Sequence, residues 1–461
     1  MSERVDVIVI GMGPGGEEVA ERLAESGLSV IGIEKQLVGG ECPYWGCVPS
    51  KMIVRGADAL AEARRVPLLA GASFVSPDWS PVAKRIREQA TDNWNDRIAV
   101  ERFERLGGRF VRGAGRLDGP GRVVVNDSVF EAARAVVVAT GSSPTIPPIP
   151  GLAGVPYWTN RELIEAGALP ETLVVLGGGA IGLELAQAVA RFGVKVTVIE
   201  ASEGLLAAEE PEAGQELVRV LSAEGLDVRV GVKAIKVART RTGAIEVILE
   251  DGDAVAGERV LVATGRRNNL VGLGLETIGL DPKRRAIAVD AHLRAGEKLW
   301  AVGDCTGAGA FTDVAVYQAR IAIADILGSE HVPADYHALP RVTFTDPEVG
   351  AAGLTERQAI QRRLNVRIGF TALSSSTRGW IHGPGNEGFI KLVEDADRGV
   401  LVGATVMGPS GGEVMSMLAL AIHASVPVAT LRTMIYAYPT FHRGIEGALT
   451  ALTEDEQRVA A

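Results

Sequence analysis

The stretch VDVIVIGMGPGG, residues 5–16, decides the fold of this chain. It opens with a run that is apolar except for Asp6, which predicts a strand buried on both faces of a parallel sheet. A helix to about residue 26 and a strand over residues 29–33 are expected to follow. Between the first strand and the helix, three glycines have the spacing that permits a tight turn, a close approach to a pyrophosphate and close helix packing: Gly11, Gly13 and Gly16. These residues predict one βαβ unit that binds a dinucleotide.

The same pattern recurs in the middle of the chain. Residues 172–176 and 195–199 predict two strands joined by a helix that ends near residue 192. Each βαβ unit ends at a glutamate, Glu34 or Glu200, whose carboxylate can accept hydrogen bonds from a ribose. The second glycine-rich turn has its glycines at Gly177, Gly179 and Gly182. Two such units indicate two bound dinucleotides, and the alternative is a pair of unrelated glycine-rich turns.

Two of the three cysteines lie close together in GGECPYWGCVPSK, residues 39–51. The spacing of Cys42 and Cys47 suits a disulfide that opens and closes at the start of a helix, where the helix N-terminus stabilises a thiolate. The alternative is two ordinary buried cysteines. The third cysteine, Cys305, is expected to be a buried packing residue.

Composition excludes several classes of function. A length of 461 residues predicts two to four domains, and a net charge of -10 argues against binding to nucleic acid or to a membrane surface. No apolar run reaches the ~20 residues that a transmembrane helix needs. The N-terminus shows no signal peptide, so we expect a cytoplasmic protein, in which a cysteine pair is more often catalytic than structural. No metal site is predicted.

The motifs divide the chain into consecutive segments. Two strand-to-turn stretches, VVVATG at residues 136–141 and VLVATG at 260–265, each close one nucleotide-binding half, and a proline-rich linker is expected over 143–156. After about Pro340 the dinucleotide signature ends. The predicted segments are a first dinucleotide-binding domain with a helical insertion (1–148), a second one (149–268), a return to the first (269–338) and a C-terminal domain (339–461).

Together these motifs resemble the pyridine nucleotide–disulfide oxidoreductases, the flavoprotein family of dihydrolipoamide dehydrogenase, glutathione reductase and mercuric reductase. The resemblance also includes AVGD at residues 301–304 and TFTDPEVG at 343–350, and covers essentially the whole chain. It implies an α/β fold with two Rossmann-like domains, one for FAD and one for NAD, and a C-terminal α+β dimerisation domain. It further implies a homodimer.

The resemblance also implies roles for particular residues. Cys47 is expected to contact the flavin and Cys42 to exchange with the incoming disulfide, while Glu184 faces Lys51 near the nicotinamide. The residues expected at FAD are Gly11, Gly13, Gly16, Glu34, Gly40, Lys51, Ala114, Thr140, Gly141, Asp304 and Thr312. Those expected at the second nucleotide are Gly177, Gly179, Ile181, Gly182, Glu200 and Gly265. Glu200 favours NAD over NADP, because its charge repels a 2′-phosphate.

The chain departs from the family near its end. The family has a His-x-His-Pro-Thr-x-x-Glu block, but here Tyr438 replaces the second histidine and Arg443 replaces the glutamate. A phenol, with a pKa of about 10, is a poor base at neutral pH, so His442 is a second candidate for the acid–base role. No cysteine follows Cys305, which weakens the resemblance to mercuric reductase. Between the paired cysteines, Tyr44 and Trp45 are expected to pack.

The sequence therefore predicts an FAD enzyme that passes electrons from NADH through the Cys42–Cys47 disulfide to a small disulfide or lipoyl-type acceptor. NADPH is the less favoured donor. Three alternatives stay open: a flavin-dependent quinone or oxygen reductase, a carboxylating variant similar to 2-ketopropyl coenzyme M carboxylase, and an FAD redox sensor without turnover.

Overall fold

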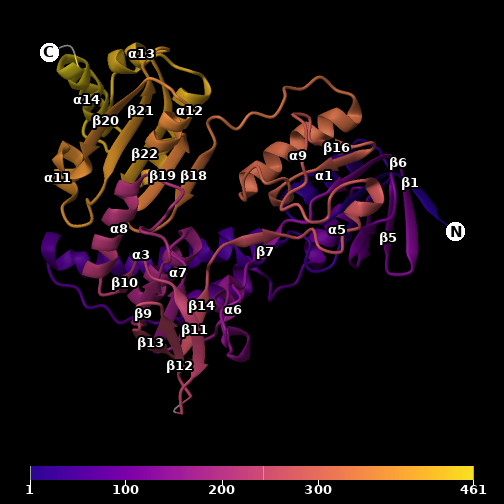
Figure 1. Ribbon diagram of the computed structural model, residues 1–461, viewed down its shortest axis with the longest axis horizontal. Helices are drawn as coiled ribbons and strands as arrows, with labels where there is room; N and C mark the ends of the chain where they lie inside the picture. The colour runs from indigo at the N-terminus through magenta and orange to yellow at the C-terminus, as the bar shows by residue number, and fades with distance from the viewer. Residues whose placement is uncertain (1, 242, 460–461) are drawn as a thin grey trace. The chain divides into compact units, whose positions relative to one another are not determined.

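The computed structural model describes residues 2–241 and 243–459 (Figure 1). The chain divides into two compact units. Unit 1 comprises Met1–Ser50, Ala83–Thr145 and Gly265–Asp335, and unit 2 comprises Lys51–Val82, Ile146–Thr264 and Tyr336–Ala461. Contacts thus group residues 51–82 with unit 2, whereas the sequence analysis assigns them to the first domain. In the part of the chain that the structure describes, no helix is both long and apolar enough to cross a membrane.

Unit 1 is built on a sheet whose main path runs β16-β17-β6-β1-β2-β3, with β4 and β5 extending from β6. The bounds of its strands are β1 (Glu3–Ile10), β2 (Val30–Glu34), β3 (Arg109–Arg112), β4 (Gly115–Leu117), β5 (Arg122–Val125), β6 (Ser128–Val138), β16 (Arg294–Gly296) and β17 (Leu299–Ala301). The predicted first strand is confirmed: Val7 and Val9 pack under the helices α1 (Pro14–Glu25) and α9 (Thr312–Leu327), while Ile8 and Ile10 pack on the other face. The strand is therefore buried on both faces.

Further helices and a two-stranded sheet accompany the main sheet of unit 1. The insertion expected after the first βαβ unit is helical over α2 (Glu41–Trp45), α3 (Cys47–Leu69), α4 (Ser80–Arg85), a π-helix (Ile86–Ala90) and α5 (Arg97–Arg105). Helix α3 begins in unit 1 and continues into unit 2, and α4 lies across the boundary at residues 82 and 83. The expected linker over 143–156 begins with a strand instead, because β7 (Ser142–Pro144) pairs antiparallel with β15 (Arg266–Asn268).

The described residues of unit 2 form three sheets. The parallel sheet β10-β9-β8-β14 carries the second dinucleotide motif and comprises β8 (Thr172–Leu176), β9 (Lys195–Ile199), β10 (Asp227–Arg229) and β14 (Arg259–Val262). The three-stranded sheet is antiparallel: β11 (Ala234–Arg239), β12 (Ile245–Leu249) and β13 (Ala254–Gly257). Helices α6 (Asn160–Glu165), α7 (Ala180–Arg191) and α8 (Pro211–Ala223) accompany these sheets.

The C-terminal part of unit 2 is a five-stranded antiparallel sheet in the order β18-β19-β22-β21-β20. Its strands are β18 (Pro340–Thr343), β19 (Glu348–Gly353), β20 (Val366–Ala372), β21 (Phe389–Asp395) and β22 (Val400–Gly408). Helices α12 (Gly411–His423) and α14 (Gly444–Val459) share one apolar core with this sheet and lie beside it in Figure 1. Shorter helices α10 (Glu356–Gln361), α11 (Thr377–His382) and α13 (Val428–Thr433) join the strands.

Candidate active site and cofactor sites

The first glycine-rich turn joins β1 to α1 with the geometry that a pyrophosphate requires. Gly11 has φ +96°, and a Cβ there would lie 2.3 Å from the carbonyl oxygen of Ala139. A Cβ on Gly16 would lie 2.0 Å from the carbonyl oxygen of Gly11, so the helix packs directly on the turn. A Cβ on Gly13 would meet no heavy atom within 4 Å. The first and third glycines thus serve packing, and the second leaves room for a phosphate at the N-terminus of α1.

The end of β6 supplies further groups that fit FAD. The hydroxyl oxygen of Thr140 is buried and has no hydrogen-bond partner among the described residues, as expected if it binds a ligand. Gly141 follows with φ +63°. Asp304 accepts a hydrogen bond of 2.5 Å from the Ser142 hydroxyl, which in turn accepts one of 2.8 Å from Arg266. These polar groups fit a hydroxylated ligand beside the turn.

The glutamate that ends each βαβ unit is fixed by backbone N–H groups. Glu34 accepts hydrogen bonds from the N–H of Met12 at 2.8 Å and of Gln36 at 2.7 Å. Glu200 accepts them from Gly178 and Ser202, both at 2.6 Å. Each carboxylate oxygen keeps a second lone pair for a ribose hydroxyl. The structure therefore shows that backbone N–H groups orient both glutamates, which the sequence analysis did not predict.

The turn in unit 2 repeats the geometry of the first. Gly177 has φ +112°, and a Cβ there would lie 2.4 Å from the carbonyl oxygen of Ala263. A Cβ on Gly182 would lie 2.3 Å from the carbonyl oxygen of Gly177, whereas a Cβ on Gly179 would meet nothing within 4 Å. Ile181, the second residue of α7, is 38 % exposed although apolar. This turn fits a second dinucleotide.

The cysteine pair lies at the junction of two helices in unit 1. Cys42 is the second residue of α2 and Cys47 the first of α3, and neither is part of a disulfide in the structure. The Cys47 sulfur lies 3.4 Å from the hydroxyl of Thr312, the first residue of α9. Two helix N-termini thus meet near this sulfur and favour negative charge on it. Cys47 is exposed, and Cys42 is partly exposed.

The pKa of the Cys42 thiol is raised far above its usual range. The first cause is its hydrogen bond to Cys47, and the second is its partial burial. Cys42 therefore keeps its proton at neutral pH and needs a base before it can attack a disulfide. The aromatic residues between the cysteines pack as expected: Tyr44 is 6 % exposed and Trp45 is 9 % exposed.

Unit 2 brings Lys51 and Glu184 together, as the resemblance implied. The Lys51 ammonium donates to Glu184 at 2.7 Å, and Glu184 is only 5 % exposed. The second oxygen of Glu184 accepts from the backbone N–H of Phe344 at 2.9 Å, and the Lys51 nitrogen lies 4.5 Å from the centre of the Phe344 ring. Lys51 is thus held in position by Glu184 of α7 and by Phe344, both distant from it in sequence.

A buried arginine anchors this pair. Arg191 of α7 is 4 % exposed and binds Asp58, Glu224 and Asp346, each with a closest nitrogen–oxygen distance of 2.7 Å. Asp346 lies two residues after Phe344. Sequence reasoning missed Arg191, because an arginine near the end of a helix carries no signal until its partners are in place.

The two C-terminal candidates for an acid–base role lie in different surroundings. Tyr438 is 62 % exposed, and the Arg443 guanidinium lies 4.8 Å from the centre of its ring. His442 instead faces Met417 of α12, with 2.7 Å between its Nε2 and the sulfur, and burial lowers its pKa. The structure therefore packs His442 against its own domain, while Tyr438 stays open to solvent.

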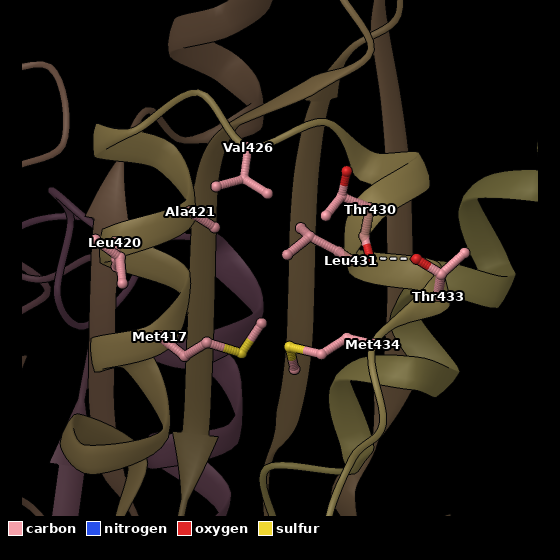
Figure 2. A pocket seen from close by; sticks show the side chains of 8 residues that line it. All are labelled: Met417, Leu420, Ala421, Val426, Thr430, Leu431, Thr433 and Met434. Atoms are coloured by element: carbon pink, nitrogen blue, oxygen red, sulfur yellow. Dashed lines mark hydrogen bonds between the residues drawn. The ribbon is translucent and has the colours of Figure 1, made fainter.

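Met417 also lines an apolar pocket of about 320 Å³ between α12 and α13. Figure 2 shows the thioethers of Met417 and Met434 pointing toward one another across it. Leu420 at its edge is 63 % exposed, and Ile435 just beyond it is 95 % exposed. An apolar surface of this kind is typical of a protein interface.

The remaining predicted residues lie in turns or in the other unit. Gly40 has φ +65° and precedes α2, and a Cβ there would lie 2.9 Å from the Cα of Gly13. Ala114 is exposed between β3 and β4. Lys51 falls in unit 2, so its place beside FAD stays a prediction; Gly265 falls in unit 1, and its contact with the second nucleotide also stays a prediction. Cys305 is fully buried, as expected, and burial raises its pKa to about 12.

Two family models match nearly the whole chain. Residues 5–319 match the pyridine nucleotide-disulphide oxidoreductase model, and residues 339–449 match the dimerisation domain of the same family. The chain belongs to this family. Its members are FAD-dependent NAD(P)H:disulfide oxidoreductases, so the protein is an oxidoreductase with a redox-active cysteine pair. The predicted fold class is confirmed.

Relatives of this family member span its full length. A dihydrolipoyl dehydrogenase from Chlorobaculum tepidum is 32 % identical, with 98 % of each chain covered. A mercuric reductase from Acidithiobacillus ferrooxidans is also 32 % identical, over 99 % of this chain and 84 % of the relative. Among solved structures, LpdA from Mycobacterium tuberculosis superposes with a TM-score of 0.85 at 28 % identity, covering 98 % of this chain and 99 % of LpdA.

Proposed function

We propose that the protein reduces a small disulfide or lipoyl-type acceptor with electrons from NADH, through the Cys42–Cys47 pair. The observation that carries this proposal is the pair itself: two hydrogen-bonded thiols, of which Cys47 is exposed at two helix N-termini. Bound FAD would accept a hydride from the nicotinamide and deliver an electron pair to a sulfur. Gly13, Thr140 and Asp304 would hold FAD, and Gly179 and Glu200 the nicotinamide nucleotide.

The protein's own groups each have a task in this reaction. In the oxidised enzyme the two sulfurs form a disulfide, and its reduction breaks that bond and leaves one proton and one negative charge on the pair. Cys42 holds the proton, while the Thr312 hydroxyl and the helix N-termini stabilise charge on Cys47. Lys51, oriented by Glu184, offers a positive charge for the reduced state.

Reduction of the acceptor requires Cys42 to act as the interchange thiol, the thiol that exchanges with the acceptor disulfide. Its thiolate attacks one sulfur of the acceptor, a mixed disulfide forms, and the other acceptor sulfur leaves as a thiolate that takes up a proton. The Cys47 thiolate then attacks the Cys42 sulfur, which restores the intramolecular disulfide and releases the second acceptor sulfur as a thiolate that takes up a proton from water. We propose that the exposed phenol of Tyr438 takes the acid–base role of the family's histidine.

Disulfide reduction is expected to accelerate continuously as the pH rises from about 6 to about 9. Only the thiolate form of Cys42 attacks a disulfide. Because the pKa of Cys42 is raised, this thiolate forms at a higher pH than in an ordinary cysteine and accumulates only at alkaline pH. The measurement is the rate of acceptor reduction at saturating NADH against pH. A plateau that begins below neutrality would contradict the assignment of Cys42 as the interchange thiol.

NADH is expected to be preferred over NADPH by at least about tenfold in kcat/KM, because the Glu200 carboxylate repels a 2′-phosphate. Glu200→Gln should narrow the ratio of the two kcat/KM values, and Glu171→Gln, which changes an exposed carboxylate at the other end of β8, should leave this ratio unchanged. Steady-state kinetics with both nucleotides check the expectation, and equal ratios in all three proteins would contradict it.

A panel of acceptors tests the proposed function. Lipoamide, glutathione disulfide and a quinone are compared as acceptors for NADH oxidation by the FAD-loaded enzyme. Reduction of a disulfide substrate supports the proposal, whereas turnover with the quinone alone favours a flavin-dependent quinone reductase. The family consists of enzymes, which argues against an FAD sensor without turnover.

The dimerisation domain implies a homodimer. We propose that the apolar surface around Met417, Met434 and Ile435 contributes to it. The cytoplasmic location stays a prediction.

A further inference from the structure

Three side chains of metal-ligand type converge in unit 1, away from the cysteine pair. They are His292, in the turn before β16, Asp325, in the last turn of α9, and His331, in the segment after α9. The Nδ1 of His292 lies 2.9 Å from the Nε2 of His331, which lies 3.7 Å from Oδ1 of Asp325. All three ligand atoms lie within 4.8 Å of one another.

The hydrogen bonds of His331 determine which of its two ring nitrogens carries the proton. The other nitrogen faces His292 and Asp325. Its Nδ1 lies 2.9 Å from the carbonyl oxygen of Ser329, and a carbonyl only accepts, so Nδ1 carries the proton. In the neutral ring Nε2 then has no proton and directs its lone pair toward His292 and Asp325. A backbone carbonyl that holds the far N–H of a histidine is the usual outer partner of a metal ligand.

The spacing of the ligand atoms matches an ion at their centre. In a tetrahedral zinc site with bonds of about 2.0 Å, neighbouring ligand atoms are roughly 3.3 Å apart. The two measured separations, 2.9 Å and 3.7 Å, bracket that value. Two imidazoles and one carboxylate form a donor set that suits zinc and other divalent transition metals, and the partial exposure of the cluster leaves a fourth position for water.

Hydrogen bonds to neighbouring residues hold the three-residue cluster in place without a metal ion. Asp325 accepts hydrogen bonds from Arg294 at 2.6 and 2.7 Å and from the Trp300 indole at 2.8 Å, which orient its carboxylate. The backbone N–H of His292 donates to Asp290 at 2.8 Å. The segment after α9 is tied to the same turn, because the N–H of Ala334 donates to the carbonyl of Ala291 at 2.7 Å.

We propose that His292, Asp325 and His331 bind a divalent transition-metal ion, with zinc as the representative. Thr312 and Asp325 are thirteen positions apart on α9, which is about 20 Å along a helix. An ion at Asp325 is therefore too far from the contact between Thr312 and Cys47 to act on the thiols. It fastens the turn before β16 and the segment after α9 to that helix, so its effect is on stability.

Zinc binding to the FAD-loaded enzyme is measured by titration calorimetry, with the cysteine pair oxidised so that its thiolates do not compete. One zinc per chain is expected, with a higher melting temperature in its presence. His292→Gln and His331→Gln should each weaken binding about 100-fold or more and remove the thermal shift, since even an outer-partner change costs 10- to 100-fold. Both variants keep the contacts of Asp325 with Arg294 and Trp300, and their flavin content reports folding.

Two controls separate this site from others. His423→Gln changes an exposed histidine in unit 2 and should leave the affinity unchanged. The Cys42→Ser/Cys47→Ser double variant should bind zinc as the oxidised enzyme does. The proposal is overturned if the oxidised enzyme binds no zinc, if both histidine variants bind it unchanged, or if the double cysteine variant loses it.

Discussion

Replacing Cys47 with serine is expected to reduce NADH-dependent disulfide reduction roughly a thousandfold or more, because a serine hydroxyl cannot form or exchange a disulfide. Cys42→Ser should have the same effect on disulfide substrates. The two variants are expected to differ in spectrum. Cys42→Ser leaves Cys47 as a free thiol at the helix N-termini, where its thiolate can give a charge-transfer band with oxidised flavin, and Cys47→Ser removes that sulfur.

The third cysteine provides the control for this prediction. Cys305→Ala changes a sulfur that is fully buried, and it should keep activity close to that of the unmodified enzyme. Rates are measured with a disulfide acceptor and with a quinone in parallel. If both serine variants still reduce disulfides at the original rate, the cysteines are not part of the electron path.

Replacing Arg191 with methionine is expected to lower the free energy of unfolding by about 1.5–3 kcal/mol, because it removes charge-assisted hydrogen bonds from a buried guanidinium to three partly exposed carboxylates. Arg191 is 4 % exposed and is shared by three carboxylates. Asp346 keeps its ion pair with Arg65, so the orientation of Glu184 by the Phe344 N–H should be weakened and not lost.

Arg219→Met is the matched control for the anchor. Arg219 pairs with Glu216 on the surface of α8, with 58 % of its side chain exposed. Its removal should cost less than about 1 kcal/mol, as exposed ion pairs usually do. Both variants are compared by urea unfolding. Equal effects of the two substitutions would show that the Arg191 cluster does not stabilise unit 2.

The parts of the fold that follow a strict local pattern were predictable from the sequence. The strands at residues 172–176 and 195–199 have those bounds in the structure, since apolar runs and glycine-rich turns leave few alternatives. The two turns were also predictable in detail, because the tight turn and the close helix contact at Gly11 and Gly16 exclude a side chain.

Features that depend on distant contacts were not predictable. The strand at residues 142–144 exists because β15, more than a hundred residues later, pairs with it, whereas the prolines of residues 143–156 suggested a linker. The contact of Phe344 with Glu184 and the convergence of His292 with His331 likewise have no signal in sequence spacing. His442 was a reasonable substitute base by position, but its ring packs beside Met417.

The most direct measurement is an anaerobic titration of the oxidised, FAD-loaded enzyme with NADH, in which flavin absorbance and free thiols are followed together. Electron flow through the cysteine pair predicts that the first equivalent creates two new thiols per chain and a thiolate–flavin charge-transfer band while the flavin stays oxidised. A first equivalent that bleaches the flavin and leaves the thiol count unchanged would contradict the account.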